Sequence, residues 1–227
     1  MAHEPLPAIL QRDLAGLETQ LRALLQPFLQ NRSHLSALNI ACGRADETEV
    51  LSRVLRSASE TVELTGLDIR GPEIGQARSR WKEQLEKKSD GTLEIQFLEH
   101  RGDQIDHLQQ LNQPGLSFIR HQNYWHDPPV WTELFRQTLD QLADDGLLVI
   151  TSYFDKEHSL ALAALQRLGA TLLCTHRNPT SRPLRDGYKK SVDRHLAIFS
   201  KPESNAVGLV TPSGESQTIL SPDFTKK

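Results

Sequence analysis

The chain has 227 residues, which suits one domain with a sizeable core and leaves little room for a second. Its 26 basic and 29 acidic residues give a net charge of −3, which argues against a nucleic-acid-binding protein. Cys42 and Cys174 lie in apolar runs and have no Cys-x-x-Cys spacing, which indicates a reduced, intracellular protein. No apolar run approaches the ~20 residues of a membrane span and the N-terminus is polar, so we expect a cytoplasmic protein. His100, His107, His126 and His158 show no ligand spacing, so no metal site is expected.

A leucine-rich stretch near the N-terminus predicts an amphipathic helix from about Ala8 to Gln26. Its apolar residues recur at intervals of three and four: Leu10, Leu14, Leu17, Leu21, Leu24 and Phe28. Such a face packs on the chain's own sheet or, as a short heptad seam, pairs two subunits, so the oligomeric state stays open. Polar residues from Asn31 to Ser36 predict a connection, and residues 1–36 are expected to form an N-terminal helical extension.

The stretch from Leu38 to Asp46 predicts a buried strand that runs into a turn of small residues. The apolar spacing after it, from Val50 to Leu55, predicts a helix. Small residues in the turn would let a ligand approach the backbone, and the helix N-terminus behind it offers free N–H groups. A turn of this kind is also common in α/β proteins that bind nothing there.

Strands and helices then alternate along the chain. The further predicted strands are Val62–Ile69, Leu93–Leu98, Leu116–Arg120, Leu147–Thr151, Thr171–Cys174 and His195–Phe199. The further predicted helices begin near Pro72, Ile105, Asp127 and Leu160. Alternation requires parallel strands with right-handed crossovers, so we expect an α/β fold: a doubly wound, mostly parallel seven-stranded sheet with helices on both faces, spanning residues 37–201. The last two strands have no helix between them and should be antiparallel, and residues 202–227 are expected to form a flexible tail.

From about Ala37 to Lys201 this order of elements resembles the class I S-adenosylmethionine-dependent methyltransferases. In that family the first strand carries an acid followed by a Gly-x-Gly-x-Gly turn, which lies against the methionine and ribose parts of the cofactor. The corresponding residues here are Asn39, Ala41, Gly43 and Ala45, so an amide replaces the acid and only the middle glycine is kept. Asn39 can still accept a hydrogen bond from an ammonium group, and alanine permits close approach provided that φ stays negative.

The resemblance also implies cofactor contacts at later strand ends. Asp68 would accept hydrogen bonds from the ribose hydroxyls, with Ile69 beside it, and Asp103 would face the adenine amino group. His121 follows the fourth strand, where the family places residues against the transferable methyl group. We expect His121 and Tyr124 to be catalytic, His121 as a general base if the nucleophile arrives protonated. Alternatively, both residues line the pocket or cap a helix.

The resemblance therefore implies a methyltransferase that binds S-adenosylmethionine and acts on a small acceptor. The loop from His176 to Arg194 is rich in basic residues, which suits an anionic acceptor or an acidic partner, although a solvated loop explains it equally well. The departures at the turn motivate an alternative, a non-catalytic scaffold or regulator of the same fold. A nicotinamide-dependent oxidoreductase is disfavoured because no Gly-x-Gly-x-x-Gly is present.

Overall fold

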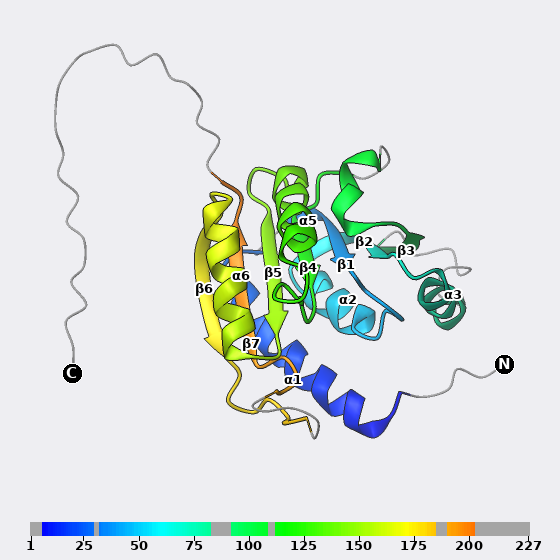
Figure 1. The fold of residues 1–227 in the computed structure, drawn as a ribbon. Coiled ribbons are helices and arrows are strands. Elements are labelled where there is room, and N and C mark those ends of the chain that lie inside the picture. The colour runs from blue at the N-terminus through cyan, green and yellow to red at the C-terminus, as the bar shows by residue number, and fades with distance from the viewer. Residues whose placement is uncertain (1–5, 30–31, 83–91, 109–111, 185–189, 203–227) are drawn as a thin grey trace, which may run out of the picture.

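Seven strands form one sheet in the order β3-β2-β1-β4-β5-β7-β6 (Figure 1). The computed structural model describes residues 6–29, 32–82, 92–108, 112–184 and 190–202. The strands are β1 (Arg32–Ile40), β2 (Ser59–Asp68), β3 (Leu93–Glu99), β4 (Leu116–Ile119), β5 (Leu147–Ser152), β6 (Thr171–Arg177) and β7 (His195–Ser200). The first five pair in parallel, whereas β7 runs antiparallel to both β5 and β6. The predicted doubly wound, mostly parallel sheet is confirmed.

Helices cover both faces of this sheet (Figure 1). They are α1 (Ala8–Leu25), α2 (Thr48–Arg56), α3 (Gly71–Arg80), α5 (Pro128–Gln141), α6 (Asp155–Arg167) and the 3-10 helix η1 (Gly102–His107). The leucines of α1 are buried with α2 and one face of the sheet, as predicted, and α5 and α6 enclose the other core. No helix in the described part of the chain is both long and apolar enough to cross a bilayer.

Local sequence explains where the helices on the second face begin. Asp127 caps α5 by accepting a hydrogen bond from the Val130 N–H at 3.4 Å, and Pro128 occupies the first turn, as the sequence predicts. The predicted start of α6 near Leu160 is wrong, because the helix already begins at Asp155. Its polar first turn resembles a loop in sequence, yet acidic residues are favoured there by the helix dipole.

Two further predictions concern the connection before β1 and the C-terminal tail. The polar connection expected from Asn31 to Ser36 is wrong over Arg32–Ser36, which belongs to β1 and pairs with the start of β2. Backbone hydrogen bonds sustain a strand that extends beyond the apolar core. The expected boundary at residue 36 therefore falls inside a strand. Nearly all of the expected tail, from residue 203 on, lies outside the described residues.

Candidate cofactor and acceptor site

The turn between β1 and α2 has a left-handed backbone at three alternate positions. φ is 58° at Ala41, 54° at Gly43 and 58° at Ala45. The two alanines therefore do not meet the condition of negative φ that was attached to close approach of a ligand at these positions. Left-handed conformations cost roughly 1–2 kcal/mol per residue that has a Cβ atom, so surrounding contacts must hold the turn. Among these contacts, the Cys42 N–H donates to the Leu67 carbonyl at 2.9 Å and so ties the turn to β2.

Asp68, the last residue of β2, lies directly beside this turn. Its buried carboxylate accepts hydrogen bonds from the Gly43 N–H at 2.7 Å and the Arg70 N–H at 2.9 Å. The Arg70 guanidinium adds a bidentate contact at 2.9 and 3.1 Å. Burial opposes ionisation, but these donors outweigh it and lower the pKa of Asp68. The carboxylate is therefore charged and faces the turn, with a guanidinium laid over it.

Behind the turn lies a buried group of polar side chains, which we call the Arg120 cluster: Asn39, Glu47, Arg120, His121 and Asp193. Arg120 binds Asp193 through two nitrogens at 2.7 and 3.2 Å, and its third nitrogen is 3.6 Å from Glu47. The Asn39 amide donates to Glu47 at 2.7 Å. Burial opposes the charge on Asp193, but Arg120 and His121 outweigh burial and lower the pKa of Asp193. Segments far apart in the chain thus meet at the carboxyl ends of β1 and β4.

His121 is the member of this cluster with a reactive ring. The backbone φ of His121 is 58°, and its backbone N–H donates a hydrogen bond to the Thr151 hydroxyl at 2.8 Å. The ring stacks on Tyr153 at 3.9 Å, and Nε2 is 2.8 Å from an Asp193 carboxylate oxygen. A carboxylate can only accept, so Nε2 carries the hydrogen and Nδ1 has the lone pair; the Asp193 N–H approaches Nε2 only at 3.4 Å. Burial lowers the pKa of His121, with Asp193 opposing the effect, so the ring is a neutral base.

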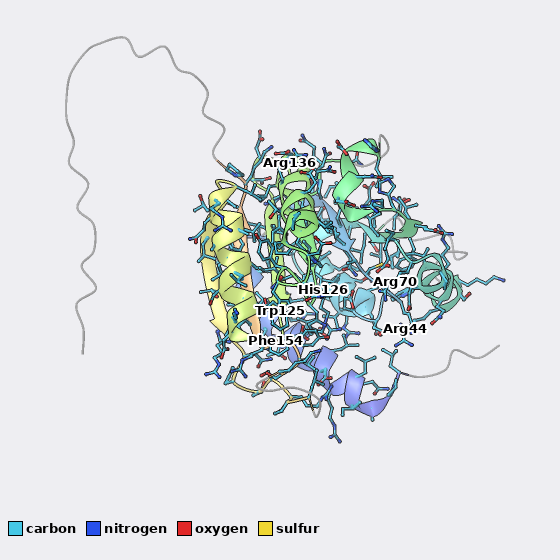
Figure 2. The ribbon with its side chains drawn as sticks, viewed as in Figure 1. Arg44, Arg70, Trp125, His126, Arg136 and Phe154 are labelled. Atoms are coloured by element: carbon cyan, nitrogen blue, oxygen red, sulfur yellow. The ribbon has the colours of Figure 1, made fainter. Side chains whose placement is uncertain are left out.

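A polar cavity of about 330 Å³ opens between the turn and the Arg120 cluster. Its lining residues are Ala41, Cys42, Gly43, Arg44, Asp46, Glu47, Arg70, Glu73, Arg120 and His121. Figure 2 shows Arg44 and Arg70 on the same side of the molecule, at the α3 end of the sheet. A hollow of about 350 Å³ between α1 and α2 is larger, but it lies away from the carboxyl ends of the strands. The cavity at the turn is therefore the candidate ligand site, as expected for an open α/β sheet.

Aromatic side chains lie next to His121, beyond the ends of β4 and β5. Trp125 is 50% exposed, and its ring is 5.5 Å from that of Phe154 (Figure 2). The Lys190 ammonium lies 4.4 Å from the Tyr153 ring centroid and 5.8 Å from that of Phe154. Stacking of Tyr153 on His121 makes this aromatic surface continuous with the cavity. A ring and a cation are thus available to a second ligand.

In the basic loop predicted as an anion site, two of the four described Lys and Arg residues form ion pairs. Arg182 binds Asp13 of α1 at 2.5 Å, and Arg194 binds Asp155 at the start of α6 at 2.6 Å. Residues 185–189 lie outside the described residues. Within the part of the loop that the structure describes, Lys190 is the cation that reaches the aromatic surface.

The structure brings several of the predicted site residues together and leaves others apart. Ala41, Gly43 and His121 line the cavity, while Asn39 and Asp68 are hydrogen-bonded to residues that line it. Ala45 is buried beneath the turn, and Ile69 is exposed beyond Asp68. Two further predicted residues also lie outside the lining: Asp103, which pairs with Arg101 at 2.6 Å, and Tyr124, which is buried against Phe135 with its hydroxyl 3.2 Å from Thr132.

The sequence reasoning missed four residues that shape the site. Arg70 had a usable signal, because it stands two residues after the strand-end acid. Glu47, Arg120 and Asp193 had none, since the ion pairs that Arg120 makes with the other two join distant segments. Arg120 and Asp193, for example, are separated by 73 positions. Such long-range pairs leave no periodic pattern in a single sequence.

Solved structures are similar to this chain over most of its length, although no family model and no curated protein sequence matches it. The N-methyltransferase NodS from Bradyrhizobium japonicum is 18% identical with a TM-score of 0.58, over 86% of this chain and 98% of its own. An S-adenosylmethionine-dependent methyltransferase from Clostridium acetobutylicum is 9% identical with a TM-score of 0.59, over 83% and 92%. Magnesium protoporphyrin IX methyltransferase from Synechocystis, with bound S-adenosylmethionine, is 12% identical with a TM-score of 0.55, over 87% and 86%.

These likenesses concern the fold, because the identities are low. Each covers more than four-fifths of the chain and so includes most of the sheet that carries the cavity. The strand order, with an antiparallel β7 between β5 and β6, agrees with the fold that the sequence resemblance implies. The chain therefore has the fold of the class I S-adenosylmethionine-dependent methyltransferases.

Proposed function

We propose that the protein is an S-adenosylmethionine-dependent methyltransferase acting on a small acceptor. The observation that carries the proposal is the left-handed turn from Ala41 to Ala45, hydrogen-bonded through Gly43 to the Asp68 carboxylate at a polar cavity that ends on His121. Fold alone would not carry it, because one fold hosts many functions. The arrangement of these side chains supplies the chemical argument.

The residues around the turn fit the cofactor. The side-chain oxygen of Asn39 is buried without a donor among the described residues, so it is free to accept from an ammonium group. Asp68 would accept from the ribose hydroxyls, and Ile69, 56% exposed, offers apolar surface to the adenine. Arg70 covers Asp68, but its side chain is 58% exposed and has space to move aside. Asp103 remains a prediction as an adenine contact.

S-adenosylmethionine supplies an activated methyl group when bound, so the protein has to orient the acceptor and remove its proton. His121 suits the second task, because Asp193 fixes its tautomer and no described residue bonds to Nδ1. The acceptor would then be a nucleophile that arrives protonated, such as a hydroxyl or an ammonium group. Tyr124 has no comparable support, since its hydroxyl lies against Thr132 in the core.

The surface beside His121 suits a small planar acceptor with an anionic group. Trp125 and Phe154 offer ring faces, and Lys190 offers a positive charge next to them. The pairing of Arg182 with Asp13 leaves fewer free cations than the composition of the loop suggests. One anionic group on the acceptor is therefore a better match than several.

Calorimetric titration with S-adenosylmethionine and S-adenosylhomocysteine tests the cofactor assignment. We expect binding of both with a dissociation constant in the ~1 μM to 1 mM range that enzymes show for substrates. Absence of binding to the intact protein would overturn the proposal.

Methyl transfer then separates an enzyme from the alternative, a non-catalytic scaffold. The protein would be incubated with methyl-labelled S-adenosylmethionine and a small-molecule extract. We expect labelled product with the wild type and a loss of at least ~100-fold with His121→Asn, because general base catalysis contributes about 10²–10⁴-fold. Asparagine tolerates the positive φ of this position, so the variant removes the base and keeps the backbone. Cofactor binding without any labelled product would favour the scaffold.

A further inference from the structure

Glu47 is a buried carboxylate whose neighbours do not balance its charge. It receives one hydrogen bond from the neutral Asn39 amide, at 2.7 Å. The nearest cation, Arg120, is 3.6 Å away and binds Asp193 through its two shorter contacts. A buried charge without a close partner is costly, so this position favours the arrival of a cation.

The charges of the Arg120 cluster lead to the same conclusion. Counting both acids as ionised, Glu47 and Asp193 contribute two negative charges and Arg120 one positive charge, while burial keeps His121 neutral. One negative charge remains beside the cavity. The nearby thiol of Cys42 responds to the same field: burial, then Glu47 and Asp68, raise its pKa.

Asn39, which is hydrogen-bonded to Glu47 but is not itself in the cavity lining, carries a second acceptor. Its amide nitrogen must face Glu47, because a carboxylate cannot donate, and this places the amide oxygen on the other side. That oxygen is buried and has no donor among the described residues. An aspartate at position 39 would place two carboxylates against each other, whereas the Asn39 amide donates a hydrogen bond to Glu47.

We propose that Glu47, together with the side-chain oxygen of Asn39, binds the ammonium group of the cofactor's methionine moiety. In the family that the sequence resembles an acid stands on the first strand, whereas here the carboxylate stands eight positions later, on the residue that precedes α2. A carboxylate is favoured at a helix N-terminus, and an ammonium group has three hydrogens to donate to these two acceptors. The inference rests on the proposed function and assigns one part of its ligand.

Two probes that differ in the amino-acid moiety test this inference by calorimetry. S-adenosylhomocysteine carries the ammonium group, whereas 5′-methylthioadenosine has the same adenosine without it. We expect Glu47→Gln to weaken S-adenosylhomocysteine binding by about 10- to 100-fold, as for loss of a hydrogen bond to a charged group, and to leave 5′-methylthioadenosine within about 2-fold. Unchanged 5′-methylthioadenosine binding also shows that the variant is folded.

Two further variants serve as control and rescue. Glu49→Gln removes an exposed carboxylate from the same helix turn, paired with Arg53, and should leave both affinities unchanged. Asn39→Asp combined with Glu47→Gln returns the charge to the strand and should restore S-adenosylhomocysteine binding. An unchanged ratio of the two affinities in Glu47→Gln overturns the inference, as does a double variant without rescue. If the wild type binds neither probe, the proposed function itself fails.

Discussion

Asp68 and Asp193 are two buried aspartates held by arginines, yet the arginines differ in their surroundings. Arg70 follows Asp68 by two residues, and its side chain is 58% exposed. Arg120 lies 73 positions from Asp193, and its side chain is 9% exposed. The first pair lies at the mouth of the cavity, and the second lies within the Arg120 cluster behind it.

The difference indicates which carboxylate is available to a ligand. An exposed guanidinium regains water when it leaves its partner, so opening the Asp68 pair costs little. A buried guanidinium without its carboxylate would be left charged in a poorly solvated position. Asp68 is therefore suited to exchanging Arg70 for ligand hydroxyls, whereas Asp193 has a fixed role in positioning Arg120 and His121.

Removing the fixed carboxylate should have the largest effect on stability. Asp193→Asn keeps a residue that tolerates the φ of 46°, but it leaves Arg120 without its main partner. We expect the free energy of unfolding to fall by about 3–5 kcal/mol in urea denaturation. As a control, Asp140→Asn on the exposed face of α5 removes a partner of Arg136 and should leave the urea midpoint unchanged. If Asp193→Asn changed the urea midpoint as little as Asp140→Asn, the proposed difference between Asp193 and Asp68 would be contradicted.

Removing the exchangeable carboxylate should affect ligand binding more than stability. Asp68→Asn removes the negative charge and replaces one of the two accepting oxygens with an NH2 group, while the shape of the side chain is preserved. We expect S-adenosylhomocysteine binding at least ~30-fold weaker, the scale of lost hydrogen bonds to a charged group. The urea midpoint should change less than in Asp193→Asn. Full binding affinity in this variant would argue against the ribose role.

Glu157 extends the comparison to a buried carboxylate that has no ion pair with a described residue. Burial raises its pKa to about 7, against hydrogen bonds from the Tyr153 and Phe154 N–H groups. Since the folded-state pKa lies above the ~4.3 of an unfolded glutamate, its stabilising contribution is complete below that pH and is lost as the pH rises through 7. Glu157→Gln should match the wild type near pH 4 and exceed its unfolding free energy by about 1–3 kcal/mol near pH 8. A difference that does not vary with pH would contradict the cause assigned here.

The smallest effect is expected from the exposed arginine itself. Arg70→Ala removes the group that competes with a ligand for Asp68. We expect S-adenosylhomocysteine to bind about 2- to 5-fold more tightly, in line with the weak net strength of exposed ion pairs. Weaker binding would mean that Arg70 contacts the ligand directly.

Much of the fold could be predicted because its signals are local. Apolar spacing marked α1, turn residues marked the start of α5, and the missing helix before β7 predicted the antiparallel pair. Strand and helix ends were less predictable where polar residues continue an element, as at Arg32 and Asp155. At these positions backbone hydrogen bonds and the helix dipole stabilise the element, so the polarity of the side chains does not indicate where it begins.

The candidate site was predicted in part, for a related reason. Gly43, Asp68 and His121 stand at strand ends, and the family resemblance implied site roles for them because of those places in the order of strands. The left-handed φ of Ala41 could not be predicted from its residue type, which disfavours it. The partners of Arg120 depend on the packed sheet, which brings together residues that no sequence spacing relates.

The reversed direction of β7 has a consequence for how this protein can diversify. Because β7 is antiparallel, its first residue pairs with the last residue of β5, and Asp193 just before it reaches the site. The loop that precedes it is fastened at both ends, by the Asn178 N–H to the Arg194 carbonyl at 2.8 Å and the Ser191 N–H to the Tyr153 carbonyl at 3.2 Å. Insertions between these anchors would leave Asp193 in place. Changes in the length or sequence of this loop can thus alter the surface beside the cavity while the contact between Asp193 and His121 is kept.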